Sequence, residues 1–134
     1  MSDIVAHLTR QMVFSRATFG PGARTKGVLD HISKEVEEVR EHLSVLEDCD
    51  KGSETEGVAL ENIAKEAVDL VILSLDGLTR ALWARYPNSS AELIADIAWY
   101  MILSKQGKNE LRNWPDWRTA DPNKAIEHIK GTHD

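Results

Sequence analysis

The sequence predicts an all-α protein: a bundle of four main helices with a short C-terminal helix. Two observations support this prediction. Apolar residues recur at steps of three and four along four long stretches, which is the period of an amphipathic helix. No stretch of useful length alternates apolar and polar residues as a half-buried strand would. A chain of 134 residues, 42% of them hydrophobic, suits one domain over residues 1–134.

The first helix is expected to begin at Ser2 or Asp3 and to end near Phe14. Residues 15–27 hold three glycines and a proline, which predict a loop. The second helix has the clearest pattern of the chain, a continuous apolar stripe. The stripe consists of Leu29, Ile32, Val36, Val39, Leu43 and Leu46.

A loop is expected at Asp48–Glu56, with Gly52 and Gly57 as helix breakers, before a third helix over Val58–Arg85. Residues 67–78 of this helix are apolar on nearly every side. A helix that is apolar all round is buried, so this stretch is predicted to be the most buried element.

The C-terminal part of the chain is expected to contain a fourth helix over residues 90–106 and a short terminal helix over Pro122–Ile129. Pro122 suits the first turn of that terminal helix. Between the two, a segment with two tryptophans around Pro115 does not suit a regular helix.

The charge balance excludes some kinds of partner. A formal charge of −6 argues against non-specific binding of nucleic acid, which needs a basic face. No apolar run approaches the about 20 residues of a membrane span, and no signal peptide is recognisable. Cys49 is the only cysteine, so no intrachain disulfide can form. We expect a cytoplasmic protein without a membrane or nucleic-acid partner.

Two pairs of acidic residues are candidate metal ligands. Glu35 and Glu38 lie three residues apart on one flank of the second helix, where two carboxylates repel unless a cation lies between them. Taken alone, this pair is also typical of a solvated acidic face. Glu66 and Asp69 have the same spacing on the third helix, and Asp69 is surrounded by aliphatic residues. A carboxylate buried there needs a counter-charge or a metal ion.

The two pairs can face each other if the helices are antiparallel, and their oxygen ligands suit Mg²⁺ or Mn²⁺. An E-x-x-E helix followed by an E-x-x-D helix resembles the all-α nucleoside triphosphate pyrophosphohydrolases, the MazG-like superfamily. The segments His7–Gln11, Thr18–Gly22 and Lys108–Arg118, the last containing Trp-Pro-Asp-Trp-Arg, resemble its phage-type dATP/dGTP pyrophosphohydrolase (MazZ-like) branch.

The resemblance implies hydrolysis of dATP or dGTP to the monophosphate and pyrophosphate with two or more Mg²⁺ or Mn²⁺ ions. It also implies a MazG-like bundle completed by oligomerisation, as a homodimer or homotetramer. Such an enzyme shapes the deoxynucleotide pool of a phage in the host cytoplasm, in some phages for DNA that carries 2-aminoadenine.

The resemblance further implies roles for single residues. The expected metal ligands are Glu35, Glu38, Glu66 and Asp69, and the expected catalytic residues are Glu38, favoured as acceptor of a proton from water, and Glu35. The candidate phosphate-binding residues are Lys105, Lys108, Asn109, Arg112 and Arg24. The candidate base-binding residues are Phe14, Ser15, Phe19 and Trp114.

Two alternatives stay open at this point. The same scaffold could serve a dUTP or dCTP pyrophosphatase, or the chain could be a non-catalytic helical dimerisation module with acids that are only surface. Basic residues at the end of the fourth helix also suit a helix C-terminus without any ligand.

Overall fold

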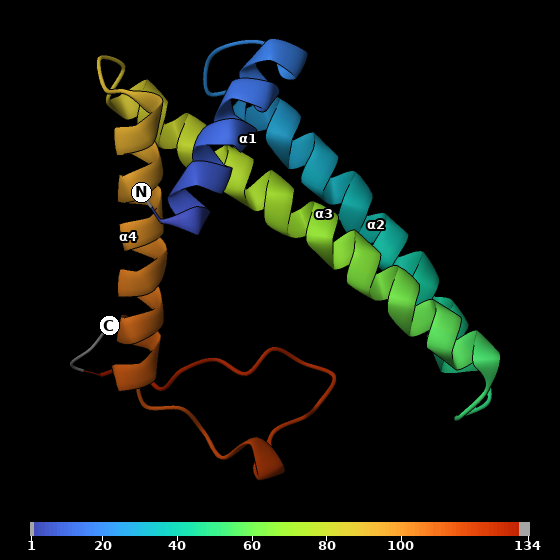
Figure 1. The fold of residues 1–134 in the computed structure, drawn as a ribbon. Coiled ribbons are helices and arrows are strands. Elements are labelled where there is room, and N and C mark those ends of the chain that lie inside the picture. Colours follow the sequence, from blue (N-terminus) through green and yellow to red (C-terminus); the bar gives the residue numbers. More distant parts are fainter. Residues whose placement is uncertain (1, 132–134) are drawn as a thin grey trace. The chain divides into compact units, whose positions relative to one another are not determined.

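The computed structural model describes residues 2–131 and confirms the all-α class. No β-strand forms among these residues; a single antiparallel bridge joins Asn113 and Ile129. The elements are α1 (Asp3–Phe19), α2 (Thr25–Asp48), α3 (Glu54–Arg85), α4 (Ala91–Leu111) and a 3₁₀ turn, η1 (Trp117–Thr119) (Figure 1).

Helices α2 and α3 form a long hairpin and lie side by side along most of their length (Figure 1). The connection between them is shorter than expected, because α3 begins at Glu54 and Gly57 lies inside the helix. Ser53 is the reason: its hydroxyl accepts a hydrogen bond from the backbone N–H of Glu56 at 3.2 Å. A capped N-terminus tolerates a glycine in the first turn, so Gly57 does not act as a breaker.

Helix α1 continues to Phe19, five residues beyond its expected end at Phe14. It ends where Gly20 takes up a positive φ of 93° and donates its N–H to the carbonyl of Arg16 at 3.0 Å. The expected loop over residues 15–27 therefore shrinks to residues 20–24, and α2 begins at Thr25.

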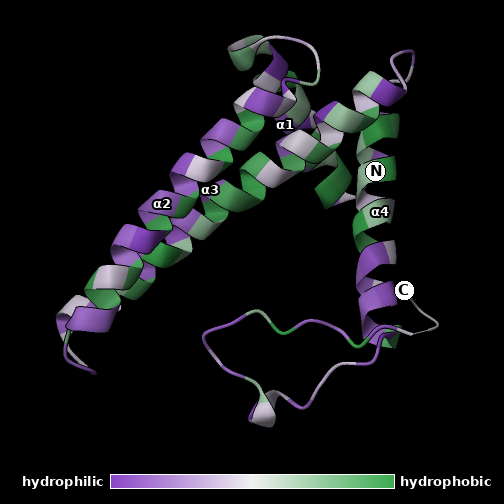
Figure 2. Cartoon of the chain, turned by 180° about the vertical axis from the view of Figure 1, so that it is seen from behind, coloured by the Kyte–Doolittle hydropathy of each residue, from purple (hydrophilic) through white to green (hydrophobic). Residues whose placement is uncertain are grey.

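The prediction that residues 67–78 are the most buried stretch is wrong for the single chain. Val68 and Val71 are each 57% exposed, and Ile72 is exposed as well. The largest fully buried side chains are instead Leu8 of α1 and Ile94 of α4. Hydropathy alone cannot tell which side of an apolar helix its neighbours cover. In Figure 2, α2 is mostly hydrophilic, whereas α3 carries more hydrophobic residues.

The chain divides into two compact units, residues 1–98 and 99–134, with the boundary inside α4. The second unit lacks the helix expected over Pro122–Ile129 and contains a turn there. The side chain of Asp121 accepts from the N–H of Asn123 at 2.9 Å, and its carbonyl accepts from Lys124 at 3.2 Å. Such local bonds from aspartate compete with helix formation.

Candidate active site

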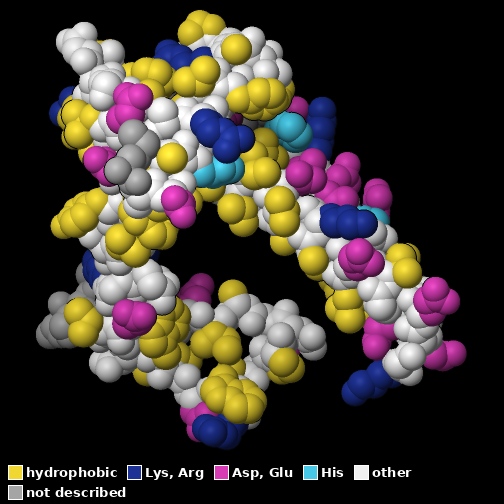
Figure 3. Space-filling model, viewed as in Figure 1, with side chains coloured by type: hydrophobic (Ala, Val, Ile, Leu, Met, Phe, Trp, Pro, Cys, Tyr) yellow, Lys and Arg dark blue, Asp and Glu magenta, His cyan; other side chains and the backbone are white. Residues whose placement is uncertain are grey.

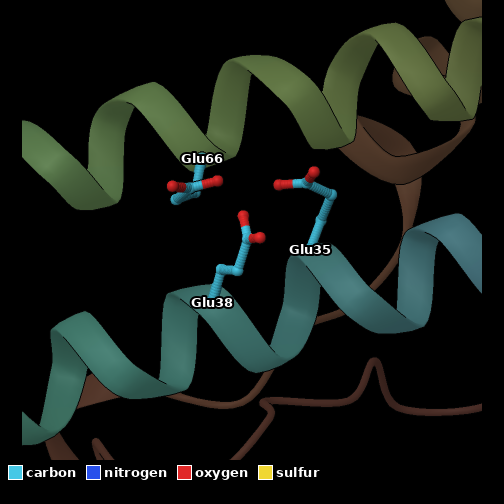
Figure 4. Close-up of side chains that lie close together, drawn as sticks. All are labelled: Glu35, Glu38 and Glu66. Carbon is cyan, nitrogen blue, oxygen red and sulfur yellow. The ribbon is translucent and has the colours of Figure 1, made fainter.

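Three of the predicted acids meet between α2 and α3. Glu35 and Glu38 project from one helix and Glu66 from the other, and their carboxylates point toward one another (Figure 4). One oxygen from each residue lies within 4.8 Å of the other two. The i,i+3 spacing places Glu35 and Glu38 on the flank of α2 that faces α3. Around them, acidic side chains gather along the hairpin (Figure 3).

This crowding changes the protonation of the acids. The pKa of Glu35 is raised to about 7. The largest cause is a hydrogen bond with Glu66, followed by loss of hydration, a hydrogen bond with Glu38 and the negative charge of Glu38; the charge of Asp69 adds a smaller effect. Hydrogen bonds from Glu35 and Glu38, and then His42, lower the pKa of Glu66 below its usual value. Without a cation, the cluster therefore holds a proton on Glu35 near neutral pH.

The cluster fits a hard divalent cation. Glu35 is only 9% exposed, and its Oε2 atom is buried without a hydrogen-bond partner. A buried carboxylate oxygen needs a donor or a cation, and the neighbouring groups are carboxylates that repel it when ionised. Oxygen-only ligands from Glu35, Glu38 and Glu66 are the donor set that Mg²⁺ and Mn²⁺ prefer.

Asp69 differs from its prediction. It was expected to be buried among aliphatic residues, but its side chain is exposed in the single chain and it is not among the three acids that meet. The aliphatic neighbours that suggested burial are themselves exposed, as at Val68 and Val71. Its charge still lies close enough to raise the pKa of Glu35, so Asp69 borders the cluster.

A histidine flanks the cluster on each side. His31 Nε2 lies 3.7 Å from Glu35 Oε1, and His42 Nε2 lies 3.5 Å from Glu66 Oε1. His31 also lines a hollow of about 350 Å³, a size ordinary for a small-molecule site. The hollow is lined by Phe19, Arg24, Gly27, Val28, Asp30, His31, Lys34, Leu73 and Asp76. Two predicted ligand-binding residues, Phe19 and Arg24, thus meet in a cavity that adjoins the acids through His31.

The other two base-binding candidates of α1 lie elsewhere. Phe14 is exposed and packs edge-to-face against Phe19, with ring centroids 6.4 Å apart. Ser15 is buried, and its hydroxyl accepts a hydrogen bond from Arg80 Nη2 at 2.7 Å. Ser15 therefore has a structural partner that the sequence did not suggest.

Arg80 is the residue that sequence reasoning missed. It is 4% exposed, and its Nε donates to both carboxylate oxygens of Asp76, at 3.0 and 3.1 Å. The i,i+4 spacing of an aspartate and an arginine was the available signal. Asp76 thus binds Arg80 and is not among the three acids that meet.

The remaining candidates lie in the C-terminal unit, together at the end of α4. Lys105, Lys108 and Asn109 lie on its last turns. Arg112 Nη1 donates to Asn109 Oδ1 at 3.0 Å, and Trp114 Nε1 donates to the carbonyl of Asn109 at 2.8 Å. These bonds tie Arg112 and Trp114 to one residue, Asn109. A role of this group in binding phosphate or base stays a prediction.

Comparison with known proteins supplies one match. The family model described as dATP/dGTP pyrophosphohydrolase matches residues 56–132, which is more than half of the chain. The matched segment includes Glu66 and Asp69 but not Glu35 and Glu38, so those two acids are tied to the site by geometry. No curated protein and no solved structure matches the chain. No helix in the described part of the chain is long and apolar enough to cross a membrane.

Proposed function

The chain belongs to the dATP/dGTP pyrophosphohydrolase family and is thus a hydrolase of phosphoric anhydride bonds, and we propose that it hydrolyses dATP or dGTP to the monophosphate and pyrophosphate with a divalent metal ion. The observation that carries the metal dependence is the meeting of Glu35, Glu38 and Glu66 around a buried oxygen that has no partner. Non-catalytic surface acids would not need to converge in this way.

Glu35, Glu38 and Glu66 would hold Mg²⁺ or Mn²⁺, with Asp69 as a fourth ligand for two or more ions. When bound, such ions neutralise the triphosphate and lower the pKa of a coordinated water. Glu38 is the proposed acceptor of the proton of the attacking water, with Glu35 beside it as the second catalytic carboxylate. Glu38 suits this role because it is the exposed member of the cluster and therefore accessible to water.

The chain's cations and aromatic residues are the proposed contacts of the nucleotide. Arg24, which lines the hollow beside His31, would bind phosphate, and Phe19 in the same hollow would contact the purine. Phe14, which packs against the Phe19 ring, and Ser15, which accepts from Arg80, are the other proposed contacts of the base. Within the C-terminal unit, the proposed phosphate contacts are Lys105, Lys108, Asn109 and Arg112, and the proposed base contact is Trp114.

A homodimer or homotetramer is the proposed assembly. Val68, Val71 and Ile72 expose a row of apolar side chains on α3 that a second copy could cover. Sedimentation should then give a mass well above 15.0 kDa, and a clean monomer would overturn this part. A role in a phage nucleotide pool, including one for 2-aminoadenine DNA, is a further prediction from the resemblance.

The substrate is tested by incubating the protein with each deoxynucleoside triphosphate and Mg²⁺ or Mn²⁺, and by resolving the products chromatographically. We expect dAMP or dGMP with pyrophosphate. Preferential turnover of dUTP or dCTP would overturn the purine assignment and leave the reaction in place.

The metal site is tested by Glu38→Gln, which keeps the size of the side chain and removes its charge. Loss of a ligand should lower Mg²⁺-dependent turnover by about a hundredfold or more while the helical circular dichroism persists. Glu37→Gln is the matched control, because Glu37 is an exposed neighbour that only pairs with Arg40, at 3.4 Å. Equal activity of both variants would contradict the proposed ligand set.

A further inference from the structure

Arg80 makes more hydrogen bonds than any other side chain described above. Its Nε donates to Asp76, its Nη1 to the carbonyls of Gly20 at 3.0 Å and Gly22 at 2.8 Å, and its Nη2 to the carbonyl and hydroxyl of Ser15 at 3.1 and 2.7 Å. A guanidinium has five N–H donors, and all five are used here. Lysine cannot reproduce this planar fork.

The segment held by Arg80, residues 20–24, needs such support. Gly20 and Gly22 have positive φ angles of 93° and 87°. Arg24 has a φ of 43° and is the one non-glycine residue with a positive φ within residues 2–131. A left-handed arginine is disfavoured unless the surrounding structure holds it. The carbonyls of Gly20 and Gly22 are the points at which Arg80 provides that hold.

The same segment contributes Arg24 to the lining of the hollow. Arg24 and the adjacent Phe19 line it from the loop side, and Asp76 lines it from α3. The Arg24 guanidinium lies 5.7 Å from the centre of the Phe19 ring, so the position of the Phe19 ring depends in part on that of Arg24. Asp76 is at once the partner of Arg80 and a lining residue of the same hollow as Arg24.

We propose that Arg80, anchored by Asp76, is a positioning residue that fixes loop 20–24 so that Arg24 and Phe19 hold the nucleotide beside the acidic cluster. It acts through the loop and touches neither the metal nor the substrate. The inference rests on the proposed function for its effect on turnover, but the placement of the loop by Arg80 is independent of any reaction.

The test is Arg80→Lys, which keeps a positive charge beside Asp76 and loses the bonds to the loop. Hydrogen exchange of the peptide covering residues 20–24 should accelerate, whereas exchange in α2 at the acids should not change. The KM for dATP or dGTP should rise about tenfold or more, the loss expected for a charge-assisted contact, with kcat within about threefold of the parent. Mg²⁺ affinity, measured by calorimetry, should not change.

Arg85→Lys is the matched control. Arg85 lies on the same helix and is exposed, and its guanidinium carbon lies 4.9 Å from the centre of the Tyr86 ring. Hydrogen exchange in loop 20–24 and the KM of the Arg85→Lys variant should therefore equal those of the parent. Faster loop exchange in Arg80→Lys with an unchanged KM would overturn the inference, and so would an unchanged loop. A fall in kcat with an unchanged KM would also overturn it, because it would place Arg80 in the chemical step.

A second variant covers the case in which Arg80→Lys does not fold. Gly22→Ala disturbs the loop without touching Arg80. An added Cβ meets no atom within 4 Å, so the variant strains only the backbone, whose positive φ is unfavourable for alanine. It leaves the pair of Asp76 and Arg80 untouched and should also raise KM and loop exchange. If the parent protein turned over no purine triphosphate, the proposed function would fail, whereas loop exchange would still decide the role of Arg80.

Discussion

Helix α3 carries two partly or fully buried carboxylate sites with opposite surroundings. Asp76 faces a guanidinium whose donors are all used, and this pair joins α3 to the end of α1 and to loop 20–24. Glu66 faces two more carboxylates, Glu35 and Glu38, and the group holds a buried oxygen without a partner. Both carboxylate oxygens of Asp76 thus have a donor, whereas one buried oxygen of Glu35 has none and is the atom that a cation could satisfy.

The largest expected effect is a loss of stability at the pair of Asp76 and Arg80. Asp76→Ala leaves the Arg80 guanidinium buried without its counter-charge, which should lower the free energy of unfolding by about 3–5 kcal/mol. Urea denaturation followed by circular dichroism measures this loss. Glu61→Ala is the control, because Glu61 is exposed and its pair with Lys65 at 3.9 Å should contribute less than about 1 kcal/mol. Similar losses in both variants would mean that the Asp76 pair adds no stability.

The acidic cluster should make the stability of the metal-free protein depend on pH. The pKa of Glu35 is raised from 4.5 in the unfolded chain to about 7 in the fold, so between these values the folded state binds more protons. Stability of the metal-free protein should therefore fall as pH rises from about 4.5 to 7 and then level off. The pKa of Glu66 is lowered, so its own contribution is lost only below pH 4.5, outside this window.

The contribution of Glu35 is isolated by Glu35→Gln. The melting temperature of this variant in EDTA should depend less on pH between 5 and 8 than that of the parent, and at pH 8 the variant should be the more stable of the two. Glu37→Gln should keep the parent's pH profile. Identical profiles for Glu35→Gln and the parent would contradict the account of the cluster as an unsatisfied, repelling group.

The smallest effect is expected at Gly27, which lines the hollow. A Cβ at Gly27 would lie 2.7 Å from Arg24 Nη2, so Gly27→Ala should displace that flexible side chain from the hollow. Stability should stay equal or rise by about 0.5–1 kcal/mol, because alanine is the better helix residue. KM for the nucleotide should rise a few-fold. Gly57→Ala, where a Cβ meets nothing within 4 Å, should change stability alone. Thermal melts and steady-state kinetics measure both.

Much of the fold could be predicted from local pattern. The four main helices and the all-α class followed from periodicity, and the family followed from the resemblance of several motifs to a known family. Helix ends were less predictable. The start of α3 is set by the cap at Ser53, and α1 continues past Phe14 until Gly20 takes up a positive φ. The prediction of a helix over Pro122–Ile129 was wrong, because the local turn at Asp121 competes with a helix that the sequence specifies only weakly.

The candidate site shows the same division. The i,i+3 spacing placed Glu35 and Glu38 on one flank of α2, and Glu66 and Asp69 on one flank of α3. The burial of these residues could not be predicted in this way. Asp69 is exposed although its sequence neighbours are aliphatic, whereas Glu35 is buried although its helix is mostly polar. Sequence neighbours describe one helix only, and burial depends on which side another helix covers.

The acidic pairs and their hard-ligand chemistry were determined by the sequence alone, because helical geometry converts a spacing of three residues into a shared face. Only the tertiary structure decided that Glu35, not Asp69, holds the buried oxygen, and that Arg80, beside Asp76 on α3, reaches Ser15, Gly20 and Gly22. The contacts of Arg80 with residues 15–22 join parts of the chain about sixty residues apart, beyond the reach of any local pattern. Hydrogen bonds across such distances are set by packing, and packing also decides which carboxylate oxygen is left buried without a donor.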